Sequence, residues 1–253
     1  MPINRYDCHL HSYLSPCSSE EMTPENIVLR AKELNLSGLC VTDHLHAETS
    51  LEQYSKLRRE FAQVNTDGLD IWIGCEVNVY NPNSWSIKPE WIDRFDVILA
   101  SPIHWIERVE KPEKFNTEIV IEYMCEMIRG AANCPGVNII AHPFWFPRIE
   151  GVVLADVLQT IINQQRLVSV FKRAAKGNIA FEINPKAVEN DVYEQAKGIY
   201  LQAVESGVKL SQCSDAHKLD VMDVWEFHDK FAEELGLSSE NFWLPNKELQ
   251  LTR

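Results

Sequence analysis

Short apolar or β-branched runs alternate with amphipathic segments along most of the chain. Seven of the runs are typical of buried strands, at residues 6–9, 38–42, 71–77, 97–101, 137–141, 178–183 and 209–214. Between them, apolar residues recur with helical spacing at 24–34, 51–63, 117–129, 153–175, 192–205 and 221–235. This alternation predicts an α/β fold with a mostly parallel sheet, either open or closed into a barrel.

Length and composition favour a single globular unit. The chain has 253 residues, of which 45% are hydrophobic, and one α/β barrel of roughly 250 residues commonly forms one domain. No repeat, low-complexity tract or Pro/Gly-rich linker interrupts the sequence. We therefore expect residues 1–253 to form one domain.

Charge and cysteine content limit the partners and the compartment. The formal net charge of −13 argues against an extended nucleic-acid surface, but not against a small anionic substrate bound at a local cluster of cations. No run approaches the roughly 18 apolar residues of a membrane helix, and the N-terminus lacks the apolar core of a secretory signal. Seven cysteines without a Cys-x-x-Cys pair favour reduced thiols. The expected location is cytoplasmic, without a membrane partner.

Polar side chains stand at or just past the C-terminal ends of all seven expected strands. In chain order they are His9 and His11, Asp43 and His44, Glu76, His104, His142, Glu182 and Asn184, and Asp215 and His217. Parallel α/β folds build their sites at this edge, so we expect these side chains to converge. His9 and His11 are two residues apart and would share one face of a strand.

A single histidine after a strand is more often a hydrogen-bonded core or surface residue than a metal ligand. Likewise Glu76 or Asp215 alone would be typical of a helix cap or an ion pair. Six histidines and two carboxylates at one rim favour a metal site over these separate structural roles, because burying so many polar groups without a cation is costly. This ligand set accommodates two or three divalent ions and suits Zn, Fe or Mn better than Ca or Mg.

Four cysteines lie on expected strands beside these residues: Cys8, Cys40, Cys75 and Cys213. Strict alternation places at least Cys8 and Cys75 on the face opposite His9 and Glu76, so we interpret the four as small core residues packed toward the helices. Cys17 differs, because it lies in the polar loop "SPCSSEE" and could approach the metal ions.

Six short motifs together resemble the polymerase and histidinol phosphatase (PHP) family. They are Asp7-x-His9-x-His11, Thr42-Asp43-His44, Gly74-x-Glu76, Ser101-x-x-His104, Ala141-His142-Pro143-Phe144 and Ser214-Asp215-Ala216-His217. Each motif alone is weak, but the set follows the family's order over nearly the whole chain. The resemblance implies a distorted seven-stranded (β/α)7 barrel with two or three metal ions at the C-terminal ends of its strands.

The resemblance also implies how the ligands divide. One metal ion would take His9, His11, Glu76 and Asp215, a second would share Glu76 and take His104 and His142, and a third would take His44 and His217. The family usually adds an Asp or His from the loop after the first strand to the third ion. Here that position falls on Ser19, with Glu20 and Glu21 following. Either a glutamate, which we take to be Glu21, reaches the ion, or the third site is weak.

These features predict a metal-dependent phosphoesterase that hydrolyses a small phosphate monoester, such as histidinol phosphate or a nucleoside monophosphate, by attack of a metal-activated water. Arg148 and Lys186 are candidates to bind the phosphoryl oxygens, although solvated loop charges fit the sequence equally well. His46 is a candidate proton donor, and Asp43 and Asp7 are candidates to orient ligand imidazoles.

Two other functions stay open: an exonuclease or phosphodiesterase acting on nucleic acid, and a non-catalytic metal-binding module. Substrate specificity is expected from the loops that contain Trp85, Trp91, Trp105 and Trp145. The sequence does not indicate the oligomeric state.

Overall fold

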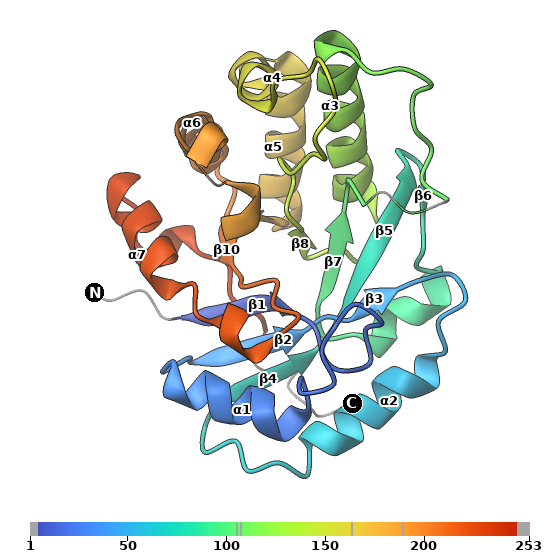
Figure 1. The fold of residues 1–253 in the computed structure, drawn as a ribbon, viewed down its shortest axis with the longest axis vertical. Helices are drawn as coiled ribbons and strands as arrows, with labels where there is room; N and C mark the ends of the chain where they lie inside the picture. Colours follow the sequence, from blue (N-terminus) through green and yellow to red (C-terminus); the bar gives the residue numbers. More distant parts are fainter. Residues whose placement is uncertain (1–4, 105, 107, 163, 189, 247–253) are drawn as a thin grey trace.

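The computed structural model describes residues 5–104, 106, 108–162, 164–188 and 190–246. Strands lie at the centre of the molecule and helices lie around them (Figure 1). The strands are β1 (Tyr6–Leu10), β2 (Gly38–Val41), β3 (His44–Leu45), β4 (Asp70–Ile73), β5 (Cys75–Asn81), β6 (Ser84–Trp85), β7 (Ile98–Ser101), β8 (Ile139–Ile140), β9 (Ala180–Ile183) and β10 (Leu210–Gln212). The α-helices are α1 (Pro24–Glu33), α2 (Leu51–Phe61), α3 (Thr117–Asn133), α4 (Leu154–Ile161), α5 (Gln165–Gly177), α6 (Tyr193–Glu205) and α7 (Trp225–Glu234).

The strands form a parallel ring of seven. Only Gly74 separates β4 from β5, and two residues separate β2 from β3, so each of these pairs continues one predicted strand. Parallel ladders then join neighbours in chain order: β1 to β2, β2 to β4, β3 to β5, β5 to β7, β7 to β8, β8 to β9 and β9 to β10. The Asp215 amide donates to the His9 carbonyl at 2.8 Å, which joins the segment after β10 to β1. The predicted seven-stranded barrel is confirmed.

Four of the predicted helical segments, 24–34, 51–63, 117–129 and 192–205, each correspond to one helix, α1, α2, α3 and α6, of which α3 continues beyond the predicted end to Asn133. The helix expected over 153–175 is instead two helices, α4 and α5, because the backbone of Gln164 is extended, with ψ 123°. The last predicted segment contains α7, which follows a 3-10 turn at Leu219–Met222. Within the described ranges, no helix combines the length and apolar character needed to cross a membrane.

A small apolar cluster fills the inside of the barrel. Its members come from strands or from segments beside them: Tyr6, Cys8, Cys40, Trp72, Val97, Leu99, Ile139, Ala141, Ala180 and Trp243. Six consecutive strands of the ring contribute to it, so it lies within the ring. Cys8 and Cys40 therefore face the interior, and the expectation that they pack toward the helices is wrong. Cys75 belongs to the main core that includes the helices, as expected.

A β-bulge in β1 explains why the strict alternation was misleading. Between Asp7 and Leu10, two residues of β1 stand opposite a single residue of β2. The two bulged residues are Cys8 and His9. Cys8 joins the inner apolar cluster, and His9 contacts Glu182, which follows Ala180 of that cluster by two residues on β9. The bulge therefore turns a core residue and a site residue inward in succession.

Candidate metal centre

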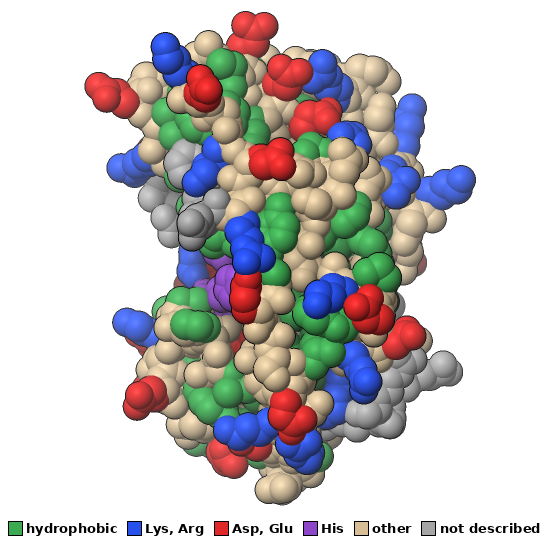
Figure 2. Space-filling view, turned by 90° about the vertical axis from the view of Figure 1, so that its right-hand side faces the viewer, with side chains coloured by type: hydrophobic (Ala, Val, Ile, Leu, Met, Phe, Trp, Pro, Cys, Tyr) green, Lys and Arg blue, Asp and Glu red, His purple; other side chains and the backbone are tan. Residues whose placement is uncertain are grey.

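The C-terminal ends of the strands open into a pocket of about 330 Å³. Histidine side chains are visible in a recess of the surface, with acidic and basic side chains beside them (Figure 2). The pocket is lined by Cys17, His44, Glu76, Ile103, His104, His142, Trp145, Asn184, Lys186, Ala187, Asp215 and His217. His9 and His11 contact this group and are fully buried. The structure thus brings together all six predicted histidine ligands and both predicted carboxylates, Glu76 and Asp215.

His9 and His11 direct the same ring nitrogen toward each other. Their Nε2 atoms lie 3.1 Å apart, and Asp215 Oδ1 lies 3.8 Å from the first and 3.4 Å from the second. The Nδ1 atom of His9 is already bound to Glu182 at 2.8 Å. Two imidazole lone pairs at this separation repel each other unless a proton or a metal ion accepts them. The pair is therefore suited to bind one cation.

Burial and carboxylates act in opposite directions on these rings. Burial alone would lower the pKa of His9, but the carboxylates of Glu182 and Asp215 outweigh it and raise that pKa well above its usual range. Burial lowers the pKa of His11 to about 3, so its ring is neutral. A neutral ring has the free lone pair that a metal ion requires.

Glu76 lies at the centre of the cluster. Its Oε2 atom lies 2.6 Å from Nδ1 of His44, and 3.7 and 3.8 Å from Nε2 of His9 and His11. Its Oε1 atom lies 3.0 Å from Nε2 of His142. The side chain is 2% exposed. The close contact between Oε2 and Nδ1 of His44 does not have the geometry of a hydrogen bond, and neither atom has another hydrogen-bond partner among the described residues. A carboxylate oxygen and an imidazole nitrogen placed this way fit two ligands of one metal ion.

Glu76 is ionised in this environment. Burial opposes its negative charge, but the charge of the neighbouring His44 and the hydrogen bond from His142 outweigh burial and hold its pKa well below the usual range. The centre therefore offers a carboxylate, rather than a neutral acid, to a cation.

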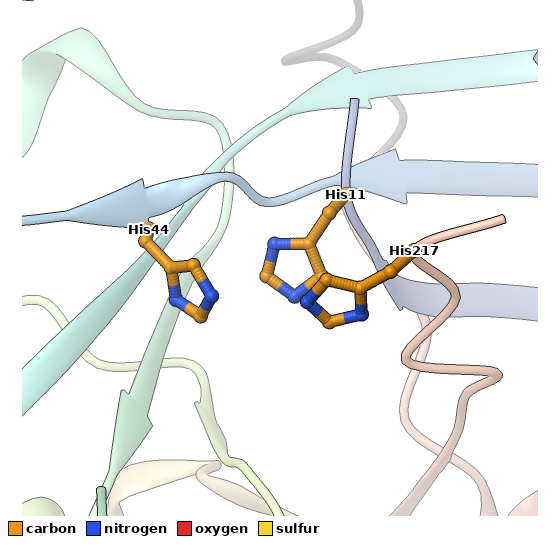
Figure 3. A group of neighbouring side chains, drawn as sticks. All are labelled: His11, His44 and His217. Carbon is orange, nitrogen blue, oxygen red and sulfur yellow. The ribbon is translucent and has the colours of Figure 1, made fainter. Parts of the chain in front are cut away.

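His11, His44 and His217 form a further group, whose ligand atoms lie within 4.8 Å of one another. The three rings converge from the end of β1, from β3 and from the segment after β10 (Figure 3). The ring centroids of His11 and His217 are 4.1 Å apart, and those of His11 and His44 are 4.4 Å apart. Nδ1 of His217 lies 3.0 Å from the carbonyl oxygen of Asp215, which leaves Nε2 for a metal ion.

His104 is oriented by an amide that the sequence analysis did not single out. Its Nδ1 lies 2.7 Å from Oδ1 of Asn78. Its ligand atom forms a compact group with those of His44 and Glu76, within 4.8 Å. A signal for Asn78 was present, because it follows Glu76 by two residues on one strand and must share its face.

Glu182 is a second residue whose role the sequence analysis missed. It lies at the end of β9, accepts a hydrogen bond from Nδ2 of Asn184 at 3.1 Å, and binds Nδ1 of His9. Carboxylates that hold the outer nitrogen of a ligand imidazole fix its tautomer and orientation. Its position at a strand end was noted from the sequence, but nothing there identified its imidazole partner.

Asp43 and Asp7 accept hydrogen bonds from backbone amides and serine hydroxyls, and not directly from the rings of the candidate ligands. Asp43 accepts hydrogen bonds from the amide and hydroxyl of Ser12, at 2.8 and 2.5 Å, and from the hydroxyl of Ser15 at 2.6 Å. Ser15 Oγ lies 3.3 Å from Nδ1 of His11, so Asp43 reaches that ring only through Ser15. Asp7 accepts two hydrogen bonds from the turn after β10.

Glu21 does not join the cluster. Its side chain is exposed, and it belongs to none of the metal-ligand groups found among the described residues. Cys17 of the same loop does face the pocket and contacts His217 and His44. Burial would raise the pKa of this thiol, but its hydrogen bonds with His217 and His44 outweigh burial and lower the pKa to about 6. The loop therefore brings a thiol, not a carboxylate, to this side of the centre.

Two of the candidate ligands, His142 and Asp215, have left-handed backbone conformations. The φ angle is 70° at His142 and 51° at Asp215. This conformation is uncommon for residues other than glycine and costs of order 1–3 kcal/mol, so it persists only where the surroundings enforce it. The Asp215 amide hydrogen bond to β1 is one such constraint. The backbone of Asp215 is thus held in place by the fold.

The two predicted phosphate-binding cations lie at different depths. Nζ of Lys186 donates to the carbonyl oxygen of Asp215 at 2.6 Å and lies 3.5 Å from Oδ2 of Asp215, at the rim of the pocket. Arg148 is exposed and lines a neighbouring groove of about 620 Å³, which shares Trp145, Lys186 and Ala187 with the pocket.

The other residues predicted for the site are His46 and four tryptophans, and only one of those that the structure describes lines the pocket. His46 is half-buried and is not among the described residues that line the pocket. Of the tryptophans expected to set specificity, Trp145 lines the pocket. Trp85 donates to a backbone carbonyl of α3, and Trp91 lies under a lysine side chain. Trp105 lies outside the described residues.

Comparisons with known proteins agree with this arrangement. The family model described as PHP domain matches residues 7–233. A comparison with curated proteins found no match. Among solved structures, histidinol phosphate phosphatase from Lactococcus lactis subsp. lactis Il1403, complexed with zinc, L-histidinol and phosphate, has a TM-score of 0.71 and 18% identity, over 98% of this chain and 99% of that chain. A candidate histidinol phosphatase from Listeria monocytogenes has a TM-score of 0.64 and 14% identity, over 87% and 97% of the two chains.

Proposed function

Because this chain belongs to the PHP domain family of metal-dependent phosphoesterases, we propose that it hydrolyses a small-molecule phosphate monoester at a centre of two or three metal ions. The observation that carries the proposal is the buried Glu76 carboxylate: its Oε2 atom lies within 3.8 Å of three imidazole nitrogens and has no hydrogen-bond partner among the described residues. The similar protein from Lactococcus lactis is complexed with zinc, histidinol and phosphate, which supports a phosphate ester as substrate.

The proposed ligands are the eight residues that converge on the pocket. They are His9, His11, His44, Glu76, His104, His142, Asp215 and His217. When bound, divalent ions lower the pKa of a coordinated water and polarise a phosphoryl group. Six imidazoles and two carboxylates leave an excess of positive charge with two or three such ions. An anionic substrate balances that excess.

The side chains around the ligands position the substrate. Lys186 stands at the rim with its ammonium group beside Asp215, where it can meet an incoming phosphate. The groove that runs from Trp145 to Arg148 continues the pocket and is the proposed place for the organic part of the ester. His46 remains the proposed proton donor to the leaving group, acting from beside His44, with ring centroids 5.9 Å apart.

Pocket size and surface charge favour a small ester over nucleic acid. The volume of about 330 Å³ lies at the lower end of the range for small-molecule sites, roughly 300–1,000 Å³. On the face in Figure 2, acidic and basic side chains are interspersed and form no basic stripe. A duplex would need such a stripe to displace its counterions.

The test is to measure metal content and hydrolysis together. The purified protein, loaded with Zn, Mn or Fe, is assayed with histidinol phosphate, a nucleoside monophosphate, an aryl phosphate monoester and single-stranded DNA. We expect at least two ions per chain and hydrolysis of a monoester. His9→Ala should lower the activity at least about 100-fold, because even the loss of an outer hydrogen bond to a ligand costs about 10–100-fold.

His228→Gln is the matched control, because it replaces a buried histidine that lies on α7 and binds the Cys213 carbonyl instead of the cluster. It should retain metal content and activity. Salt-sensitive cleavage of DNA without monoester hydrolysis would instead favour the nuclease. A metal-loaded protein that hydrolyses none of these substrates would favour the non-catalytic module.

A further inference from the structure

The loop over residues 12–19, which follows β1, is tied to the metal centre at both ends. At its start, Asp43 binds Ser12 and Ser15. At its end, the amide of Ser19 and the hydroxyl of Ser18 donate to the carbonyl oxygen of His217, at 2.9 and 3.2 Å. The residue between these ties that faces the pocket is Cys17. Its position is therefore set by hydrogen bonds that do not involve its own side chain.

The surroundings of Cys17 are those of a metal ligand. The thiol lines one pocket with His44 and His217, and these two and His11 have ligand atoms within 4.8 Å of one another. The same pocket contains Glu76, 2% exposed, whose Oε2 has no hydrogen-bond partner among the described residues. Two imidazoles, a thiol and an unpartnered carboxylate oxygen at one place are suited to bind a cation.

We propose that Cys17 is a ligand of the third metal ion, together with His44 and His217, so that one ion of the centre is bound by a thiolate. The inference rests on the proposed function only in assuming that the centre holds metal ions. It accounts for the exposed position of Glu21: the loop supplies a sulfur ligand two residues before Ser19, where the carboxylate or imidazole had been expected.

The other cysteines show that Cys17 is placed differently from a structural thiol. Six are buried: Cys8, Cys40, Cys75, Cys125, Cys134 and Cys213. Cys17 is exposed and lines the pocket. A sulfur ligand changes which ion is preferred, because thiolates select zinc and other soft ions over magnesium or manganese. The third site should therefore be the most zinc-selective of the centre.

Cobalt substitution tests the inference. Co(II) replaces zinc in protein sites and gives a thiolate-to-metal charge-transfer absorption only when sulfur is bound. The full-length protein, loaded with Co(II), should show this band. Cys17→Ser should lose the band and bind the third ion at least about 100-fold more weakly, since loss of a ligand exceeds the 10–100-fold cost of losing an outer partner. Cys17→Asp should lose the band and keep the ion.

Cys125→Ser, in α3 and outside the pocket, is the matched control and should retain both band and ion. Wild-type protein that binds its full complement of Co(II) without the band would overturn the inference, whatever the variants do. The outcome is separate from that of the proposed function. A band without phosphatase activity would contradict the function alone, and activity without a band would contradict the sulfur ligand alone.

Discussion

Buried polar side chains determine which nitrogen of two candidate ligand imidazoles, those of His9 and His104, faces the cluster. Glu182 binds Nδ1 of His9 and Asn78 binds Nδ1 of His104, at 2.8 and 2.7 Å. Each ring is thereby left with Nε2 toward the cluster. Because the correct tautomer of each ring is already fixed before an ion binds, no free energy is spent on selecting it. Glu182 and Asn78 would therefore increase the affinity for the metal ion without touching it.

Replacing Glu182 by glutamine should therefore weaken metal binding. The variant keeps the size of the side chain but removes the charge that holds the His9 ring, so affinity should fall by about 10–100-fold. Competition with a chelator measures this. Asp67→Asn, which changes an exposed carboxylate of a surface ion pair, serves as control and should leave affinity unchanged. Equal affinities of Glu182→Gln and wild type would show that Glu182 does not support the ligand.

His228 should make the stability of the metal-free protein depend on pH. Burial lowers its pKa to about 4, although its bond to the Cys213 carbonyl opposes the shift. The unfolded chain binds a proton below about pH 6.5, while the folded chain stays neutral at this ring. The contribution of this neutral ring to the free energy of unfolding is therefore fully present above about pH 6.5 and is lost as the pH falls toward 4.

Between pH 7 and pH 5 this ring should account for a loss of about 2 kcal/mol in the free energy of unfolding. Denaturant titrations at the two pH values, on wild type and His228→Gln, measure the difference. The variant should lose less stability than wild type over this interval. Identical losses would mean that the ring is protonated in the folded protein.

The success and failure of the residue predictions have a common physical basis. The convergence of the eight candidate ligands could be predicted because the direction of a strand decides where its last side chains lie. Glu21 was predicted by counting residues within a loop, and a loop has no periodicity that fixes the direction of a side chain. Its neighbour Cys17 faces the centre instead, held by hydrogen bonds from serines that the sequence does not pair with any partner.

Gly74 shows how the backbone of one element depends on its neighbour. It lies between β4 and β5, directly before the segment that carries Glu76. A Cβ atom at this position would lie 2.3 Å from the carbonyl oxygen of Val97, the residue directly before the adjacent strand β7. Backbone atoms within a parallel ladder cannot move aside, so only glycine fits here.

Gly74→Ala should therefore destabilise the protein by at least about 3 kcal/mol, the upper part of the range for overpacked cores. Denaturant unfolding measures the change. Gly198→Ala in α6 is the control: its Cβ would meet the tip of the Ile162 side chain, which can rotate away, so the effect should stay within about 1 kcal/mol. A Gly74→Ala variant as stable as wild type would mean that β5 and β7 can separate without cost.

The regular strands and helices could be predicted from the sequence, whereas the irregularities within and between them could not. The order of strands and helices followed from periodicity, since buried runs and amphipathic stripes are local patterns. The bulge in β1 and the break before α5 were not predicted. A bulge is a mismatch between two paired strands, so it appears only when the partner of Cys8 and His9 is known. The error in the orientation of Cys8 followed directly from this.

At the scale of the molecule, the metal centre joins strands from both ends of the chain. Removing the ions with a chelator should therefore lower the unfolding temperature. An ion present at 1,000 times its dissociation constant contributes about 4 kcal/mol, which for a chain of this size corresponds to roughly 8–16 °C. Thermal unfolding with and without chelator measures the shift. His9→Ala should show a smaller shift, and a wild type unaffected by the chelator would contradict a metal-stabilised fold.

The closure of the ring between β1 and the segment after β10 has a consequence for biosynthesis. His9 is synthesised well before His217, and at about 5–20 residues per second roughly 10–40 s separate them. During that interval the first histidines leave the ribosome without Asp215 or His217. A nascent chain halted before β10 would carry most of the ligands but no complete centre. Metal loading therefore has to follow the synthesis of the last strand.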